Sequence, residues 1–108
     1  MRIEFTPEAV KDIEGTKTYL LVTYGEKTAS DNVKKVMERI SSLKQFPNQG
    51  CGVWERYGIE SDYRYIYVNH NYVFYRVVDE NVRIIRILDA RCDFLRVLFG
   101  INDQTDNE

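Results

Sequence analysis

Hydrophobic and polar residues alternate along the second half of the chain, between Tyr63 and Leu88. Three short runs rich in Tyr, Val and Ile are broken at Asn69-His70-Asn71 and again at Asp79-Glu80-Asn81. Polar, turn-forming residues between such runs are typical of antiparallel strands joined by tight turns. The pattern therefore predicts a three-stranded antiparallel meander.

The length of the turns decides which side chains share a face of this predicted sheet. If both turns are three-residue loops, Val68 lies opposite Tyr72. Arg64 then lies opposite Arg76, with Arg86 on the next strand of the same face. Like charges that lie opposite each other across two strands are destabilising, so this face is predicted to bind an anion.

Two helices are predicted before the sheet. The first runs from Pro7 to about Thr23, because Thr6 can cap a helix and Pro7 is well tolerated in its first turn. The second runs from Glu26 to Phe46 and ends before Pro47. Gly25 joins them tightly, so they are expected to form an antiparallel hairpin. This hairpin is expected to cover the tyrosine-rich face of the meander, which carries Tyr63, Tyr65, Tyr67 and Tyr75. The apolar face of the second helix is expected to consist of Ala29, Val33, Val36, Ile40, Leu43 and Phe46.

The two ends of the chain supply shorter elements. Residues 2–5 alternate as a short strand, and residues 90–100 are compatible with a short helix. The predicted fold class is α+β: a short N-terminal strand, an antiparallel helical hairpin packed on an antiparallel β-sheet meander, and a short C-terminal helix. Residues 1–101 are expected to form a single domain, with 102–108 as a frayed polar tail.

An irregular, glycine-containing segment, residues 48–62, contains two aromatic residues. Trp54 and Tyr57 are expected to plug the edge of the core there. The single histidine, His70, lies in a predicted turn and is expected to be exposed.

Composition narrows the class of protein. Hydrophobic residues make up 44% of the 108 residues and charged residues 30%, as in ordinary globular domains. A formal net charge of −2 argues against a protein that coats nucleic acid through bulk charge. No signal peptide or apolar run long enough to span a membrane is recognisable, so a cytoplasmic location is expected.

The chemistry-bearing motifs are few. Cys51 and Cys92 are the only cysteines, and they are expected to stay reduced, without a disulfide or a metal ion. No phosphate-binding loop or nucleophile motif occurs, and no cofactor is expected. Asp89 and Asp93 flank Arg91 and could form a carboxylate pair; a structural role, either an ion pair with Arg91 or a helix start at Asp89, is favoured.

Basic residues change type along the chain. All lysines lie at or before Lys44, and from Gln45 onward every base is an arginine. Arginine forms bidentate contacts with phosphate or carboxylate, so the second half of the chain favours recognition of a defined anionic group. The alternative is that these arginines pair with acidic side chains of the same region.

Three segments resemble the RelE/ParE superfamily of toxins from type II toxin-antitoxin modules, also called plasmid stabilisation proteins. They are the FYRV box at 74–77, the turn at 79–81 and the tail IIRILDARCDFLRVLF; the opening IEFTPEAVKDI is similar as well. The resemblance covers residues 2 to about 100. It implies a RelE/ParE-like fold and a growth-inhibiting toxin that a small cognate antitoxin neutralises.

The superfamily divides into ribosome-dependent mRNA interferases, the RelE branch, and inhibitors of DNA gyrase, the ParE branch. Tyr72 stands where the RelE-like ribonucleases carry an arginine, Asp89 where the family has a histidine, and Cys92 where the RelE branch has a late arginine. RNA cleavage needs a base as well as cations, and no convincing base is present. The resemblance therefore implies ParE-like inhibition of a target such as DNA gyrase.

Two alternative functions stay open: an endoribonuclease acting on ribosome-bound mRNA, and a degenerate, non-toxic binding module. The sequence also leaves the oligomeric state open. The residues expected to bind the partner or target are Arg64, Tyr72, Arg76, Arg86, Asp89 and Arg91.

Overall fold

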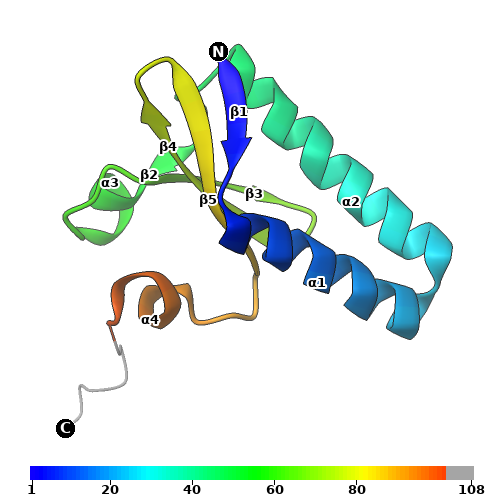
Figure 1. Ribbon diagram of the computed structural model, residues 1–108. Coiled ribbons are helices and arrows are strands. Elements are labelled where there is room, and N and C mark those ends of the chain that lie inside the picture. Colours follow the sequence, from blue (N-terminus) through cyan, green and yellow to red (C-terminus); the bar gives the residue numbers. More distant parts are fainter. Residues whose placement is uncertain (102–108) are drawn as a thin grey trace, which may run out of the picture.

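The protein forms a five-stranded sheet with a helical hairpin on one face and two short helices on the other (Figure 1). The computed structural model describes residues 1–101, so the predicted frayed tail, 102–108, lies outside the described residues. The sheet order is β1-β5-β4-β3-β2. The strands are β1 (Arg2–Phe5), β2 (Cys51–Gly52), β3 (Arg64–Val68), β4 (Asn71–Val78) and β5 (Asn81–Asp89). The predicted α+β fold class is confirmed.

The predicted meander is the centre of this sheet, since β3, β4 and β5 pair in antiparallel order. Two further strands extend it. The N-terminal strand β1 lies parallel to β5, and the short strand β2 pairs with the start of β3 on the opposite edge. The sequence pattern predicted β1 as a strand but not its partner, because the pairing joins residues almost eighty positions apart.

The turns of the meander contain two residues each, and the prediction of three-residue loops was wrong. Asn69 and His70 both adopt positive φ, 53° and 69°, which is the backbone of a two-residue hairpin turn. Asn71 is therefore a strand residue, paired with Val68. The next turn is closed in the same way, by pairing of the residues at 78 and 81. The register of β3 against β4 differs by one residue from the predicted one, which changes the side chains that share a face.

An extra residue in β5 changes the faces a second time. Tyr75 lies opposite Ile84 and Phe74 lies opposite Arg86, so Ile85 has no partner in β4. Such a bulge breaks the regular alternation of faces. As a result both Ile84 and Ile87 pack into the core beneath the hairpin, although strict alternation would place them on opposite faces.

The helical hairpin consists of α1 (Pro7–Tyr24) and α2 (Glu26–Ser41), followed by a 3-10 turn, η1 (Ser42–Lys44). Thr6 caps α1 by accepting a hydrogen bond from the Ala9 backbone N–H at 3.0 Å, as its position predicted. Gly25, at a φ of 101°, makes the tight link between the helices. The regular part of the second helix ends earlier than predicted, and Phe46 is 61% exposed because it lies beyond this end.

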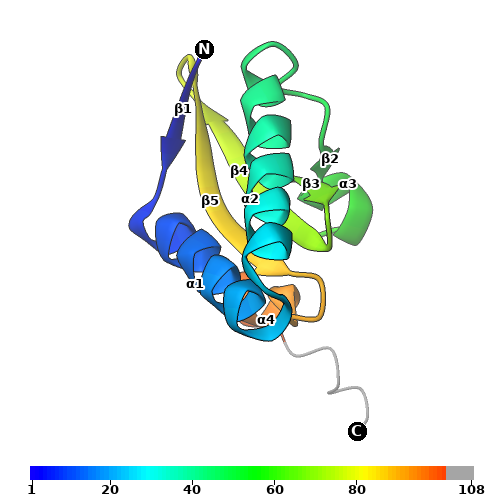
Figure 2. The ribbon, with the colours of Figure 1, turned by 90° about the vertical axis from the view of Figure 1, so that its right-hand side faces the viewer.

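The core beneath the hairpin is the larger of two apolar clusters. It consists of Ala9, Val36, Ile40, Leu43, Ile66, Val73, Tyr75, Val82, Ile84 and Ile87. Figure 2 shows α1 and α2 in front of the sheet. Tyr75 is the one tyrosine of the predicted tyrosine-rich face that is fully buried in this cluster.

The opposite face of the sheet carries an aromatic cluster beneath α3 (Val53–Tyr57) and α4 (Phe94–Phe99). Phe74 is fully buried there, and its ring lies 5.0 Å from that of Phe94 and 5.6 Å from that of Tyr65. The prediction that the hairpin covers the tyrosine-rich face was therefore wrong for most of its tyrosines. Tyr57 packs against this cluster, but Trp54 is 55% exposed and does not plug the edge of the core.

Candidate functional site

The three arginines expected to form one anion-binding surface do not meet. Arg64 lies opposite Tyr75, on the hairpin side of the sheet, where it donates hydrogen bonds to the backbone carbonyls of Asn48 and Gly50 at 3.1 and 2.6 Å. Arg76 lies opposite Arg83, not opposite Arg64. The predicted shared surface is therefore wrong, because the two-residue turn moves Arg64 to the other face.

The two arginines that do lie opposite each other are each compensated by a carboxylate. Arg76 donates to Asp62 at 2.6 Å, and Arg83 pairs with Glu4 at 3.4 Å. The repulsion between Arg76 and Arg83 across the two strands is therefore offset by carboxylates of the protein itself.

Arg86 forms the most buried ion pair among the described residues. Its Nε and Nη2 donate to the two carboxylate oxygens of Asp12 at 2.7 and 3.0 Å. The side chains are only 27% and 14% exposed, and Asp12 also accepts the backbone N–H of Ile87 at 2.9 Å. The hydrogen bonds that Arg86 donates to Asp12 are the main reason that the pKa of Arg86 is raised. This pair ties α1 to β5, so its geometry is that of a structural bond.

Asp89 and Arg91 form the ion pair, one of the two structural roles expected of Asp89. The Asp89 carboxylate accepts the backbone N–H of Arg91 at 2.8 Å and its Nε at 2.9 Å. The helix-start role belongs to Asp93, which accepts the backbone N–H of Arg96, and not to Asp89. Hydrogen bonds from the Arg91 side chain lower the pKa of Asp89, and the backbone N–H of Arg91 acts in the same direction.

The lowered pKa of Asp89 gives a pH-dependent prediction. The pKa of Asp89 in the folded chain lies below the value of an aspartate in the unfolded chain, about 3.9. The Asp89 carboxylate therefore contributes fully to stability above pH ~3.9. This contribution is lost as the pH falls through the folded pKa. In urea unfolding, the stability difference between the native chain and Asp89→Asn is expected to be constant from about pH 7 to about pH 5 and to shrink near pH 3. A difference that persists undiminished at pH 3 contradicts this assignment.

Tyr72, the remaining predicted residue, makes contacts with other aromatic rings. It is half-buried in the aromatic cluster, with its ring 5.2 Å from the rings of both Tyr67 and Phe94. Its partner across the ladder is Leu88, so its side chain is on the face beneath α4. A binding role for the six predicted residues stays a prediction, and the structure divides them among separate places.

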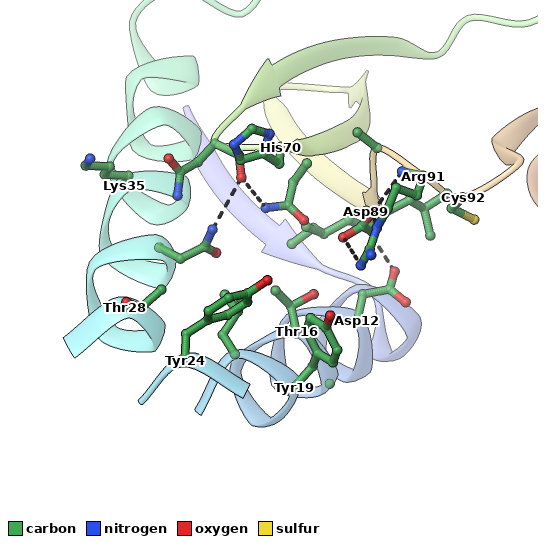
Figure 3. Close-up of a pocket in the computed structure, with 18 of the residues that line it drawn as sticks. Asp12, Thr16, Tyr19, Tyr24, Thr28, Lys35, His70, Asp89, Arg91 and Cys92 are labelled. Atoms are coloured by element: carbon green, nitrogen blue, oxygen red, sulfur yellow. Dashed lines mark hydrogen bonds and ion pairs between the residues drawn. The ribbon is translucent and has the colours of Figure 1, made fainter. Parts of the chain in front are cut away.

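A cavity of about 860 Å³ lies between the helical hairpin, the β3–β4 turn and the end of β5. It brings together Asp89 and Arg91 with residues of α1 and α2, as the close-up in Figure 3 shows. The Arg91 guanidinium lies over the Tyr19 ring, 5.7 Å from its centre. His70 lies at this cavity and is exposed, as predicted.

Sequence reasoning missed Asn32, the polar residue of α2 that lines this cavity. Asn32 Nδ2 and Asn71 Nδ2 both donate to the backbone carbonyl of Asn69, at 3.3 and 3.0 Å, which fastens the β3–β4 turn to α2. Asn32 follows Ala29 by three residues and precedes Val36 by four, so it occupies a core-facing position of the helix. A polar residue at a core-facing helix position could have marked Asn32 in the sequence as a candidate functional residue.

Among residues 1–101, no group of three or more His, Cys, Asp or Glu side chains is placed so that it could hold a metal ion. Cys51 is exposed and Cys92 is half-buried, and both are free thiols. No helix in this part of the chain is long and apolar enough to cross a membrane.

The comparison that decides the family is a match to the family model described as ParE toxin of type II toxin-antitoxin system, parDE, over residues 3–94. The chain belongs to the ParE toxin family. It is the toxin component of a type II toxin-antitoxin module, a system that pairs each toxin with an antitoxin. The resemblance inferred from the FYRV box and the C-terminal tail is confirmed.

A solved structure supports the fold of this ParE-family toxin. A chain of the chromosomal ParDE TA system from P. aeruginosa superposes with a TM-score of 0.70 at 24% sequence identity, covering 82% of this chain and 95% of that chain. No match was found among curated proteins. At this identity the structural likeness concerns the fold alone.

Proposed function

We propose that this ParE-family toxin inhibits its target by binding, that the target is DNA gyrase, and that it acts in the cytoplasm. The observation that carries the proposal is the state of the arginines that a ribonuclease would use. Arg76, Arg86 and Arg91 are each held by their own carboxylate. Cations that stabilise the charge building on a phosphate must be directed at it, and each of these three is instead directed at a different carboxylate.

A general base is the second requirement of RNA cleavage, and Asp89 is poorly suited to it. An effective base has a pKa near the working pH, whereas Arg91 lowers the pKa of Asp89. Asp89 is also occupied by hydrogen bonds from Arg91. The arrangement favours a binding toxin over a nuclease.

Purified toxin added to gyrase and relaxed plasmid tests the proposal. Supercoiling is expected to fall as the toxin is titrated and to recover when the cognate antitoxin is added in equal amount. Undiminished supercoiling at a large excess of folded toxin would count against gyrase as the target. Uninhibited growth of cells that express the chain without antitoxin would instead favour the degenerate, non-toxic module.

The antitoxin is proposed to be a small, acidic protein that adds a strand to the open edge of β3. Strand β2 pairs only with Tyr65 and Arg64, so Ile66–Val68 have no partner on this side among the described residues. Exposed strand edges are templates for pairing with an extended segment. In a two-residue hairpin Val68 and Asn71 form the hydrogen-bonded closing pair, so the backbone N–H of Tyr67 points outward.

Tyr67→Pro tests this edge, because proline removes the outward N–H and leaves the donors to β4 in place. Tyr67→Ala is the matched control, since it removes the same side chain and keeps the N–H. We expect Tyr67→Pro to weaken antitoxin binding about tenfold, and Tyr67→Ala to weaken it much less. Calorimetric titration of the two folded variants measures the difference; equal affinities would show that the antitoxin binds elsewhere.

A further inference from the structure

The lining of the cavity includes a residue with a buried hydrogen-bond acceptor that has no donor. Asn32 lines the cavity and is only 8% exposed. Its Oδ1 is buried and has no hydrogen-bond partner among the described residues, while its Nδ2 makes a long, 3.3 Å bond to the Asn69 carbonyl. Unpaired buried acceptors are rare because they lose water without compensation. An occupant that satisfies Asn32 must therefore bring an N–H or O–H donor.

The carboxylates around the cavity differ in how firmly they are engaged. Asp12 and Asp89 are held by Arg86 and Arg91. Asp31 pairs only with Lys27, at 3.3 Å, and that lysine side chain is 90% exposed. Because pairs between exposed side chains are weak, Asp31 remains available to a second cation.

The cationic side chains of the cavity leave room for such a partner. Lys35 extends away from the tyrosines at the centre of the view in Figure 3. Arg91 is already paired with Asp89 and lies over the Tyr19 ring. The charged side chains of the lining are three carboxylates, Asp12, Asp31 and Asp89, against these two cations.

Aromatic rings on α1 border the same space (Figure 3). The contact of Arg91 with Tyr19 shows that a guanidinium can lie on a ring at this site. Tyr24 is 63% exposed, and no cation lies over its ring among residues 1–101. Tyrosine faces attract cations, and planar guanidinium groups stack on them.

We propose that this cavity binds an arginine side chain presented by an extended segment of a partner protein. The guanidinium would donate to the Asp31 carboxylate while it stacks on Tyr24, and a rotation of the Asn32 amide on binding would bring its Oδ1 within reach of the same group. An anionic group would offer Asn32 only another acceptor. A volume of about 860 Å³ is far larger than one side chain needs, so residues flanking the arginine would also lie in the cavity. This site is separate from the β3 edge and does not depend on gyrase being the target.

Nuclear magnetic resonance of the isotope-labelled full chain tests the proposal with the tripeptide Ac-Ala-Arg-Ala-NH2. Saturable shifts are expected at the side-chain amide of Asn32 and at the Asn69 backbone. The same peptide with norleucine or glutamate in place of arginine is expected to bind at least about tenfold more weakly. Free agmatine separates the two possible sources of the guanidinium, and it should also bind about tenfold more weakly; agmatine that binds as tightly as the peptide would overturn a partner segment as the occupant.

Variants locate the binding in the cavity. Asn32→Leu is expected to weaken the arginine peptide about tenfold by removing the acceptor, and Tyr24→Ala about threefold by removing the ring. Trp54→Ala removes another exposed aromatic side chain, which does not line the cavity, and should leave the affinity unchanged. Since Asn32→Leu also removes the bond to the turn, Tyr24→Ala decides the matter if that variant does not fold. Absence of shifts at Asn32, or equal effects of Tyr24→Ala and Trp54→Ala, would overturn the proposal.

Discussion

Replacing Asp12 with alanine is expected to lower the free energy of unfolding by about 3 kcal/mol, the scale found when one partner of a buried ion pair is removed. The variant leaves the Arg86 guanidinium without its carboxylate, and the backbone N–H of Ile87 loses its acceptor. Both groups lie in the packed region between α1 and β5. Urea unfolding followed by circular dichroism measures the loss.

Asp31→Ala is the matched control for this prediction. It also removes a helical aspartate from an ion pair, but Asp31 and Lys27 are exposed. Its effect is expected to be within about 0.5 kcal/mol of zero. Similar losses in the two variants would mean that the pair between Asp12 and Arg86 contributes little to the fold.

Gly50→Ala is expected to destabilise the protein by about 3 kcal/mol or more, because a methyl group at this position has no room. The added Cβ would lie 2.6 Å from the backbone carbonyl oxygen of Tyr65 and 2.7 Å from the hydroxyl of Tyr75. That hydroxyl is fixed, since it accepts the Gly50 backbone N–H at 3.1 Å and donates to the Pro47 carbonyl at 2.6 Å. Thermal and urea unfolding of the variant measure the cost.

Gly15→Ala supplies the opposite expectation in the same assay. Gly15 lies within α1, and an added Cβ meets nothing within 4 Å. Alanine at this position is expected to stabilise the helix by about 0.5–1 kcal/mol. A Gly50→Ala variant as stable as the native chain would show that the segment before β2 can move away from Tyr65.

Elements governed by local sequence could be predicted with little error. The hydroxyl of Thr6 and the proline after it mark the start of α1, and Gly25 separates the two helices as expected. Apolar spacing also identified most of the buried side of α2. Local capping and periodicity depend on residues within one or two turns of each other, which a single sequence displays directly.

The register of the strands and the positions of the site residues could not be predicted from local sequence. The sequence Asn69-His70-Asn71 is compatible with a two- or a three-residue loop, and only the positive φ of both Asn69 and His70 makes it the shorter one. The bulge at Ile85 then redistributes the side chains of β5. The partner of Arg86 lies 74 positions away, in α1, so no spacing rule connects them. Errors of one residue in a strand exchange its two faces, which is why the predicted arginine surface did not form.

Inhibition of gyrase by binding, without RNA cleavage, can be distinguished from nuclease activity in cells that express the toxin without its antitoxin. Plasmid topology and primer extension on a highly translated mRNA should be measured in the same culture. Plasmid negative supercoiling is expected to fall after induction while the mRNA remains uncut. Cuts at codon positions with unchanged plasmid supercoiling, lost in an Arg76→Ala variant that still folds, would contradict this proposal.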